Sequence, residues 1–94
     1  MIKRLVRLPL KPQMGPEFEA IFIEKNNGIT AFDGCISVEM WRDIKEPDTY
    51  WTVSEWVSEE ALNNYRASDF FGDVWPKLKT MLAEKAQAWS LEQM

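Results

Sequence analysis

The chain begins with a loose alternation of apolar and basic side chains over residues 2–10, which is typical of a β-strand. Pro9 stands near the end of this stretch, where a terminal position of a strand tolerates it. Residues 11–16 are rich in turn formers, and Pro16 suits the first position of a helix. The pattern therefore predicts a first strand and a turn that leads into a helix.

After residue 16 the spacing of apolar residues changes from that of a strand to that of one face of a helix. Large apolar residues recur at helical spacing: Phe18, Ile21, Phe22, Ile29 and Phe32. This spacing predicts a helix over about residues 16–31, which Asp33 and Gly34 end. Alternation of period two over residues 35–42 and 50–57 predicts two further strands, joined by a hairpin loop at residues 45–49.

Two short helices are predicted after the third strand. Ser58 has the character of an N-cap, and acidic residues follow it in the first turn, where the helix dipole favours negative charge. This helix would run to about Arg66, and Ser68 would start the next one. Its apolar residues continue to Leu82, but Pro76 cannot donate a backbone hydrogen bond. We therefore expect a kink or break near Gly72–Trp75.

Residues 88–91 predict a short closing strand, so the order of elements is β-α-β-β-α-α-β. This is the split βαβ pattern of a ferredoxin-like α+β fold, with helices on one face of the sheet and a single domain over residues 1–94. The third strand carries large apolar residues on both of its faces, so a second layer is needed on the side without helices. We expect a homodimer in which two such sheets form a barrel.

The composition supports a second copy of the chain as that layer. Hydrophobic residues make up 46% of the sequence and five residues are Trp, which is a heavy apolar load for a small domain. The formal net charge of −4 argues against nucleic acid as a partner, because phosphate binding depends on clustered Lys and Arg. No stretch approaches the roughly 18 apolar residues of a membrane span.

Cysteine and histidine usage narrows the chemistry. Cys35 is the only cysteine, so an internal disulfide and a thiolate zinc site are both excluded, and a reducing cytoplasm fits. There is no histidine, which removes the commonest general base, the commonest metal ligand and the usual axial ligand of haem. We therefore expect neither a metal nor another cofactor.

Three segments resemble a known family. The stretch Phe32-Asp-Gly-Cys35 leads into the second strand, Glu55-Trp56 precedes the segment Ser58–Tyr65, and Ser68-Asp-Phe-Phe71 follows. In order and spacing these segments resemble the antibiotic biosynthesis monooxygenase family over nearly the whole chain. Most of the shared positions are caps, turns and packing residues, so the resemblance concerns the fold more than the substrate.

The resemblance implies a dimeric barrel and three kinds of role: oxidation of anthrone or quinol rings by molecular oxygen without a cofactor, oxidative haem degradation, and uncharacterised small-molecule roles. Haem-degrading relatives use an Asn, a Trp and a His, and the corresponding positions fall near Val6, Tyr65 and Trp75. None of the three residue types is kept. We therefore expect a cofactor-independent monooxygenase of a planar phenol or quinol, with a non-catalytic small-molecule-binding or stress-related protein as the alternative.

Relatives that oxidise anthrones hold the phenolic substrate and its anion with Asn, Trp, Tyr and Arg side chains. By resemblance, Asn64, Tyr65 and Trp75 are the candidate catalytic residues, and Asn63 is a candidate substrate contact. Neighbours on a helix point about 100° apart, so only one asparagine can face inward, and we favour Asn64. Core packing is the alternative for Tyr65 and Trp75.

Further substrate-binding candidates lie on the predicted strands. Arg7 could stabilise an anion, and Glu55 stands in an otherwise apolar strand, where burial would make it a base. A salt bridge from Glu55 to Arg7 or Arg42 is the alternative. Trp51 is a candidate ligand contact, with barrel packing as its alternative.

Overall fold

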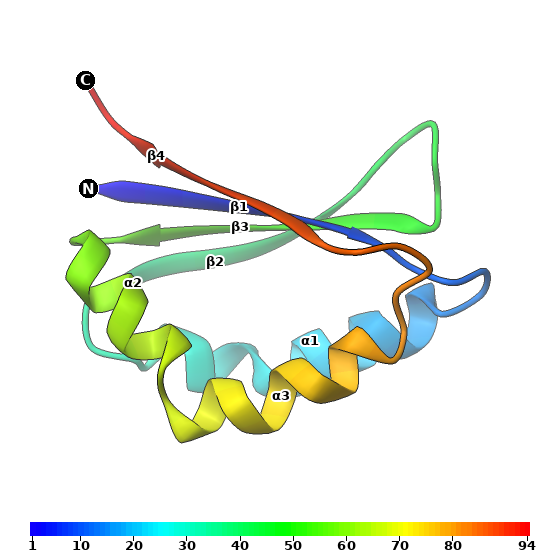
Figure 1. The fold of residues 1–94 in the computed structure, drawn as a ribbon, viewed down its shortest axis with the longest axis horizontal. Helices are drawn as coiled ribbons and strands as arrows, with labels where there is room; N and C mark the ends of the chain where they lie inside the picture. Colours follow the sequence, from blue (N-terminus) through cyan, green and yellow to red (C-terminus); the bar gives the residue numbers. More distant parts are fainter.

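The structure is a computed structural model that describes all residues, 1–94. Its elements are β1 (Ile2–Pro9), α1 (Gly15–Thr30), β2 (Cys35–Arg42), β3 (Thr49–Trp56), α2 (Glu59–Arg66), α3 (Asp69–Lys79) and β4 (Gln87–Glu92) (Figure 1). This order confirms the predicted α+β fold. No helix is long and apolar enough to cross a membrane.

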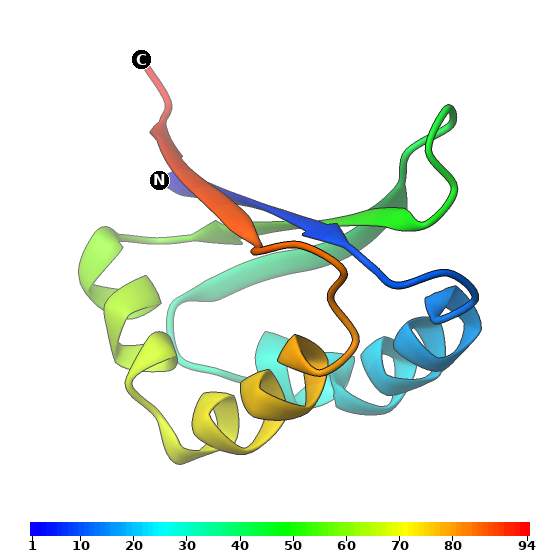
Figure 2. The ribbon, with the colours of Figure 1, turned by 45° about the vertical axis from the view of Figure 1, so that its right-hand side comes forward.

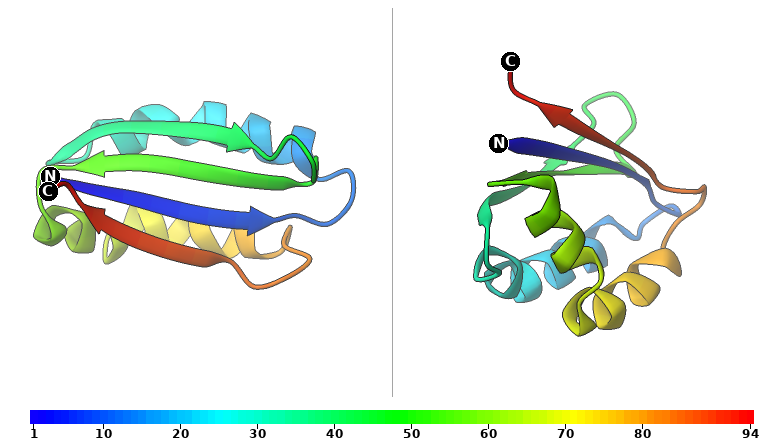
Figure 3. Two further views of the ribbon diagram at one scale, coloured as in Figure 1. Left: turned by 90° about the horizontal axis from the view of Figure 1, so that it is seen from above. Right: turned by 60° about the vertical axis from the view of Figure 1, so that its left-hand side comes forward.

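The four strands form one antiparallel sheet in the order β2-β3-β1-β4, and the three helices cover one of its faces (Figures 1 and 2). β1 and β3 are the central strands, with Arg4 opposite Ser54 on β3 and opposite Ser90 on β4. Seen from above, both chain ends lie at the same end of the sheet (Figure 3). Because side chains alternate along a strand, each residue can be assigned to the helix-covered face or to the open face.

Side-chain caps fix the starts of the two short helices. Ser58 Oγ accepts a hydrogen bond of 3.1 Å from the backbone N–H of Ala61, and Ser68 Oγ accepts one of 3.2 Å from that of Phe71. Each hydroxyl satisfies an amide that the first helical turn leaves without a partner. The predicted starts of both helices are therefore confirmed.

The predicted break in the last helix is wrong, because α3 is continuous over Asp69–Lys79 with Pro76 inside it. Proline removes only its own backbone donor, and three residues follow it before the helix ends, so little of the hydrogen-bond ladder is lost. The helix also stops before Leu82, which forms an isolated bridge with Leu10 beyond the end of β1. Trp75 and Leu78 of α3 pack against the larger core cluster, which helps to hold the helix in place.

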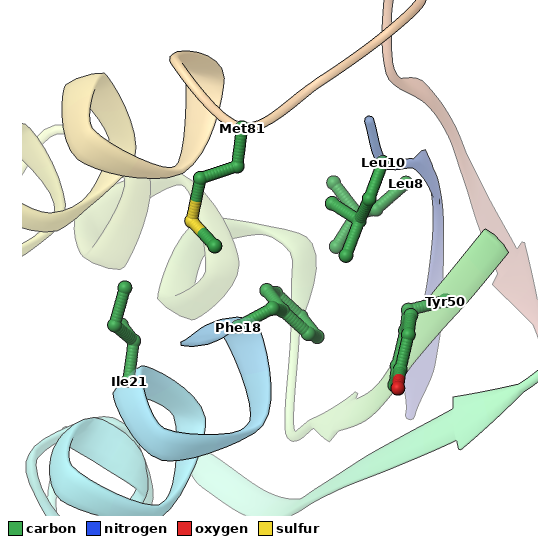
Figure 4. Packing of buried hydrophobic residues seen from close by; sticks show 6 residues of the cluster. All are labelled: Leu8, Leu10, Phe18, Ile21, Tyr50 and Met81. Atoms are coloured by element: carbon green, nitrogen blue, oxygen red, sulfur yellow. The ribbon is translucent and has the colours of Figure 1, made fainter. Parts of the chain in front are cut away.

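The core lies between sheet and helices in two clusters. The larger one joins β1, α1, β3 and the segment after α3, and contains Leu8, Leu10, Phe18, Ile21, Tyr50 and Met81 (Figure 4). The Tyr50 hydroxyl in this cluster donates a hydrogen bond of 2.5 Å to Glu19 Oε2. The smaller cluster contains Ile2, Trp56 and Leu62. Trp56 and Phe18 are almost completely buried, so the clusters anchor both ends of the helical layer.

The open face of the sheet carries a continuous set of apolar residues: Leu5, Trp41, Trp51, Val53, Trp89 and Leu91. Trp51 and Trp89 stack across the sheet with ring centroids 5.8 Å apart, and Trp41 is 58% exposed. The β2–β3 hairpin and the end of β4 both rise on this side of the sheet (Figures 1 and 2). No element of the chain itself covers this face.

Candidate functional site

A cavity of about 320 Å³ lies between the helix-covered face of the sheet and the three helices. Its volume falls within the range of small-molecule sites, about 300–1,000 Å³. Strand residues from β1, β2, β3 and β4 face residues of all three helices across it. The cavity is therefore enclosed by elements from both halves of the chain.

Aromatic side chains form much of the helical wall. Phe71 and Trp75, one turn apart on α3, are nearly parallel, with an interplanar angle of 9° and centroids 5.9 Å apart. Tyr65 on α2 stacks on Trp56 with centroids 5.1 Å apart and meets Phe71 edge-on at 5.3 Å. Flat, rigid faces of this kind suit a planar ring system as ligand.

The polar groups of the cavity are few and come from both the sheet and the helices. Ser54 is buried and its Oγ accepts a hydrogen bond of 3.0 Å from Trp56 Nε1. The charged residues that line the cavity are Arg4, Lys25 and Arg66, and no Asp or Glu lines it. The cavity is therefore cationic, although the whole chain has a net charge of −4.

Tyr65 is the phenol of this cavity. Burial, with a smaller contribution from nearby Cys35, raises its pKa to about 12. The ordinary pKa of tyrosine is about 10, so Tyr65 is protonated throughout the neutral range. Its hydroxyl can donate a hydrogen bond to an anion, but it cannot serve as the base that removes a substrate proton.

We expect the two tyrosines of the chain to ionise late in the folded protein. The pKa values of Tyr50 and Tyr65 are both raised, so tyrosinate absorbance of the folded protein should remain low at pH 10. In denaturant at the same pH it should rise to about half of its maximum, because the ordinary pKa of tyrosine is about 10. A raised folded-state pKa means that the folded protein holds more protons above pH 10. Stability should therefore fall as the pH rises from about 10 to about 12, and Tyr65→Phe should remove part of this loss. Tyrosinate absorbance at pH 10 that is as high in the folded protein as in denaturant would contradict the assignment.

Arg4 is the central cation. It lies on β1 with its side chain toward the helices, where Nη1 donates a hydrogen bond of 2.8 Å to Ser90 Oγ on β4. Burial lowers the pKa of Arg4, and the positive charge of Arg66 lowers it further. The two guanidinium groups are therefore close enough to repel each other electrostatically.

Two of the predicted catalytic residues, Tyr65 and Trp75, line this cavity, but Asn63 and Asn64 do not. Leu62 and Tyr65, three positions apart, occupy the inward face of α2, so both asparagines point outward and are exposed. The expectation that Asn64 faces inward is therefore wrong.

The strand candidates lie on the opposite side of the sheet. Trp51 and Glu55 alternate with Ser54 and Trp56 on β3, and Arg7 precedes the buried Leu8 on β1, so all three face away from the helices. The Arg7 guanidinium pairs with Glu46 at 3.6 Å, and Glu55 forms no ion pair with Arg7 or Arg42. The expectation that these three residues contact a substrate in the cavity is therefore corrected, because strand alternation places them on the open face.

Arg4 was missed by reasoning from residue types, although the signal was present. It shares its parity with Val6 and Leu8, the apolar residues that turn toward the core. A basic residue spaced by two from buried apolar residues of the same strand points to the same face as they do, and such a charge can face a cavity. No three His, Cys, Asp or Glu side chains come together as a possible metal site.

Comparison with known proteins adds a family and a fold. The family model described as antibiotic biosynthesis monooxygenase matches residues 1–75. Among curated proteins, no sequence matches significantly.

Solved structures resemble the whole chain closely. A conserved protein from Methanosarcina mazei superposes with a TM-score of 0.92 at 20% identity, covering 99% of this chain and 92% of that one. A structure described as an antibiotic biosynthesis monooxygenase has a TM-score of 0.90 at 17% identity, covering 100% and 99%. An asparagine-to-alanine variant of SnoaB from Streptomyces nogalater, described as a cofactor-independent oxygenase, has a TM-score of 0.86 at 14% identity, covering 98% and 91%.

Proposed function

The chain belongs to the antibiotic biosynthesis monooxygenase family, and from this premise we propose that it oxidises a planar phenol or quinol with molecular oxygen and without a cofactor. The observation that carries the proposal is the cavity itself, which combines flat aromatic walls with an all-cationic set of charges. One protein of the same fold is, by its description, a cofactor-independent oxygenase.

The reaction places modest demands on the protein. For an anthrone, the ring methylene becomes a carbonyl: one atom of O₂ enters the product, and the other leaves as water with the two methylene hydrogens. The ionised substrate supplies the electrons, so the protein must favour the anion, exclude water and admit oxygen. Aromatic and aliphatic side chains make up most of the cavity wall and meet the second demand.

The cationic lining meets the first demand. Since no Asp or Glu lines the cavity and the chain has no His, no residue there is a ready general base at neutral pH. Arg4 and Arg66, which form no ion pair, instead create a positive potential, which lowers the pKa of a bound phenol by favouring its anion. The protonated Tyr65 hydroxyl adds a hydrogen-bond donor.

The test is oxygen consumption with an anthrone in metal-free buffer that contains chelator. We expect turnover by the wild-type protein well above the buffer rate, saturable in anthrone and unaffected by added flavin or metal ions. A rate equal to that of buffer would remove the enzymatic proposal for this substrate class.

A binding module is the second candidate function, and the absence of a carboxylate or imidazole base among the cavity residues favours it. A protein of this kind would hold the same planar anion without reacting. Saturable quenching of tryptophan fluorescence by the anthrone, with no oxygen consumed, would identify this function.

We also propose that the protein is a homodimer joined through the open face of the sheet. Leu5, Val53 and Trp89 lie in one cross-strand row of this face, and Trp41 and Trp51 lie in the next. The raised hairpin and the end of β4 flank this surface, so a second sheet would fit between them (Figure 2). Burial of the tryptophans would supply the apolar area that a small single chain lacks.

Light scattering on a size-exclusion peak should give twice the 11.0-kDa mass of the chain. Val53→Glu should shift the protein toward the monomer, because it places a charge at the centre of the interface. Ile23→Glu is the matched control, since Ile23 is 73% exposed on α1, away from the sheet. A wild-type monomer at micromolar concentration would contradict the proposal.

A further inference from the structure

The cavity contains positive charges that no acidic side chain neutralises. The two ion pairs of the chain are Arg7–Glu46 on the far side of the sheet and Lys25–Glu24 between neighbours on α1. Arg4 and Arg66 therefore have no carboxylate partner. This is unusual because acidic residues outnumber basic ones by 15 to 11 in the sequence.

Of these two arginines, Arg4 gives the stronger indication of an anionic ligand. It is half-buried at a central strand of the sheet, and its hydrogen-bond partner is the neutral hydroxyl of Ser90. Removing a guanidinium from water without an anion is costly, and a like charge nearby adds to the cost. A neutral side chain at position 4 would not carry this desolvation cost. An anionic ligand that binds the guanidinium would offset it.

Arg66 approaches from the opposite wall. It is the last residue of α2, where the carbonyl ends of the helix favour a cation. Its side chain lines the cavity together with that of Arg4, although the residue is largely exposed to solvent. One guanidinium is therefore fixed by the sheet, and the other reaches in from the edge of the cavity.

We propose that the cavity selects a planar aromatic ligand that carries a carboxylate, with Arg4 and Arg66 holding the carboxylate and the apolar walls holding the rings. Guanidinium groups bind carboxylates through paired N–H donors, a geometry that a single phenolate oxygen cannot use fully. The nearly parallel rings of Phe71 and Trp75 line the cavity and would contact the ring system of the ligand. This inference rests on the proposed function, and it adds a substrate class to it.

Binding of an unreactive matched pair tests the inference without turnover. The probes are 2-naphthoate and naphthalene-2-carboxamide, which share their rings and differ by one charge, and isothermal titration measures their affinities. We expect the carboxylate to bind the wild-type protein on the order of 10- to 100-fold more tightly than the amide, as for a hydrogen-bonded charge pair. Arg4→Gln and Arg66→Gln should each reduce this preference, because they weaken binding of the carboxylate more than binding of the amide.

Lys3→Gln is the matched control, because Lys3 adjoins Arg4 on β1, points to the opposite face and carries the same charge. Arg4→Lys guards against misfolding, and it should retain part of the preference through its charge alone. Equal affinities for the two probes, no binding of either, or an unchanged preference in Arg4→Gln would overturn the inference. A carboxylate preference without oxygen consumption would preserve it while removing the enzymatic function.

Discussion

Replacing Tyr65 by phenylalanine is expected to lower anthrone turnover about 100- to 1,000-fold, the usual cost of losing one hydrogen-bond donor to a developing anion. The substitution removes a single oxygen atom and leaves the ring that stacks on Trp56 and meets Phe71 edge-on. Because the pKa of Tyr65 is raised to about 12, its hydroxyl is a donor at every pH at which the assay is practical. Oxygen consumption at saturating anthrone measures the effect.

Tyr50→Phe is the matched control for this substitution. Tyr50 is the only other tyrosine, and its hydroxyl donates to Glu19 in the core, outside the cavity. We expect its turnover to remain within a few-fold of the wild type, as for a change that touches no ligand group. Equal rates for the wild type and Tyr65→Phe would show that this phenol does not contact the reacting anion.

Gly34→Ala is expected to lower the free energy of unfolding by about 2–5 kcal/mol. Gly34 has a φ angle of +85°, a conformation that costs a residue with a side chain about 1–2 kcal/mol. A methyl group there would also lie 2.5 Å from Cβ of Ala61 on α2 and 3.1 Å from Cγ2 of Val57. Overpacking of this kind typically costs about 1–3 kcal/mol more. Denaturant unfolding at fixed protein concentration gives the difference.

Gly72→Ala separates these causes from the general effect of removing a glycine. Gly72 lies inside α3 with no atom within 4 Å of an added methyl group, so alanine should stabilise the protein by about 0.5–1 kcal/mol. In the double variant with Ala61→Gly, the Gly34→Ala change should lose most of its steric part, because only the close contact of 3.1 Å with Val57 remains, and keep its backbone part. A Gly34→Ala protein as stable as the wild type would mean that the turn before β2 is not held in this conformation.

The fold was largely predictable because each element carries its own local signal. The caps at Ser58 and Ser68 and the period-two stretches at residues 35–42 and 50–57 depend on nearby residues alone. The continuity of α3 was not predictable in this way. Pro76 weakens a helix locally, whereas Trp75 and Leu78 of α3 pack against a core cluster whose members lie mostly far away in the sequence.

The site was predicted less well for a related reason. Tyr65 and Trp75 could be found from residue type, because aromatic residues on the inner faces of helices line a cavity or fill a core. To tell whether Asn64 or a neighbour faces inward, one must know how α2 is rotated about its own axis. To place Arg7, Glu55 and Trp51, one must know which residues of β1 and β3 face the helices. The parity of Arg4 with Val6 and Leu8 could have been read from the sequence, but its place beside Arg66 in one cavity depends on how α2 lies over the sheet.

The two chain ends lie side by side because Ile2 pairs with Glu92 across the β1–β4 edge (Figure 3). A short linker between them would turn β4 and β1 into a hairpin, and new ends could open in the exposed loop between β2 and β3, where Ile44 is 95% exposed. The permuted chain would start with β3 and finish with β2. Exchanging β1 with β3 and β2 with β4 turns the strand order β2-β3-β1-β4 into its own reverse. The domain is therefore two β-α-β halves related by an approximate twofold axis, and either half can come first in the chain.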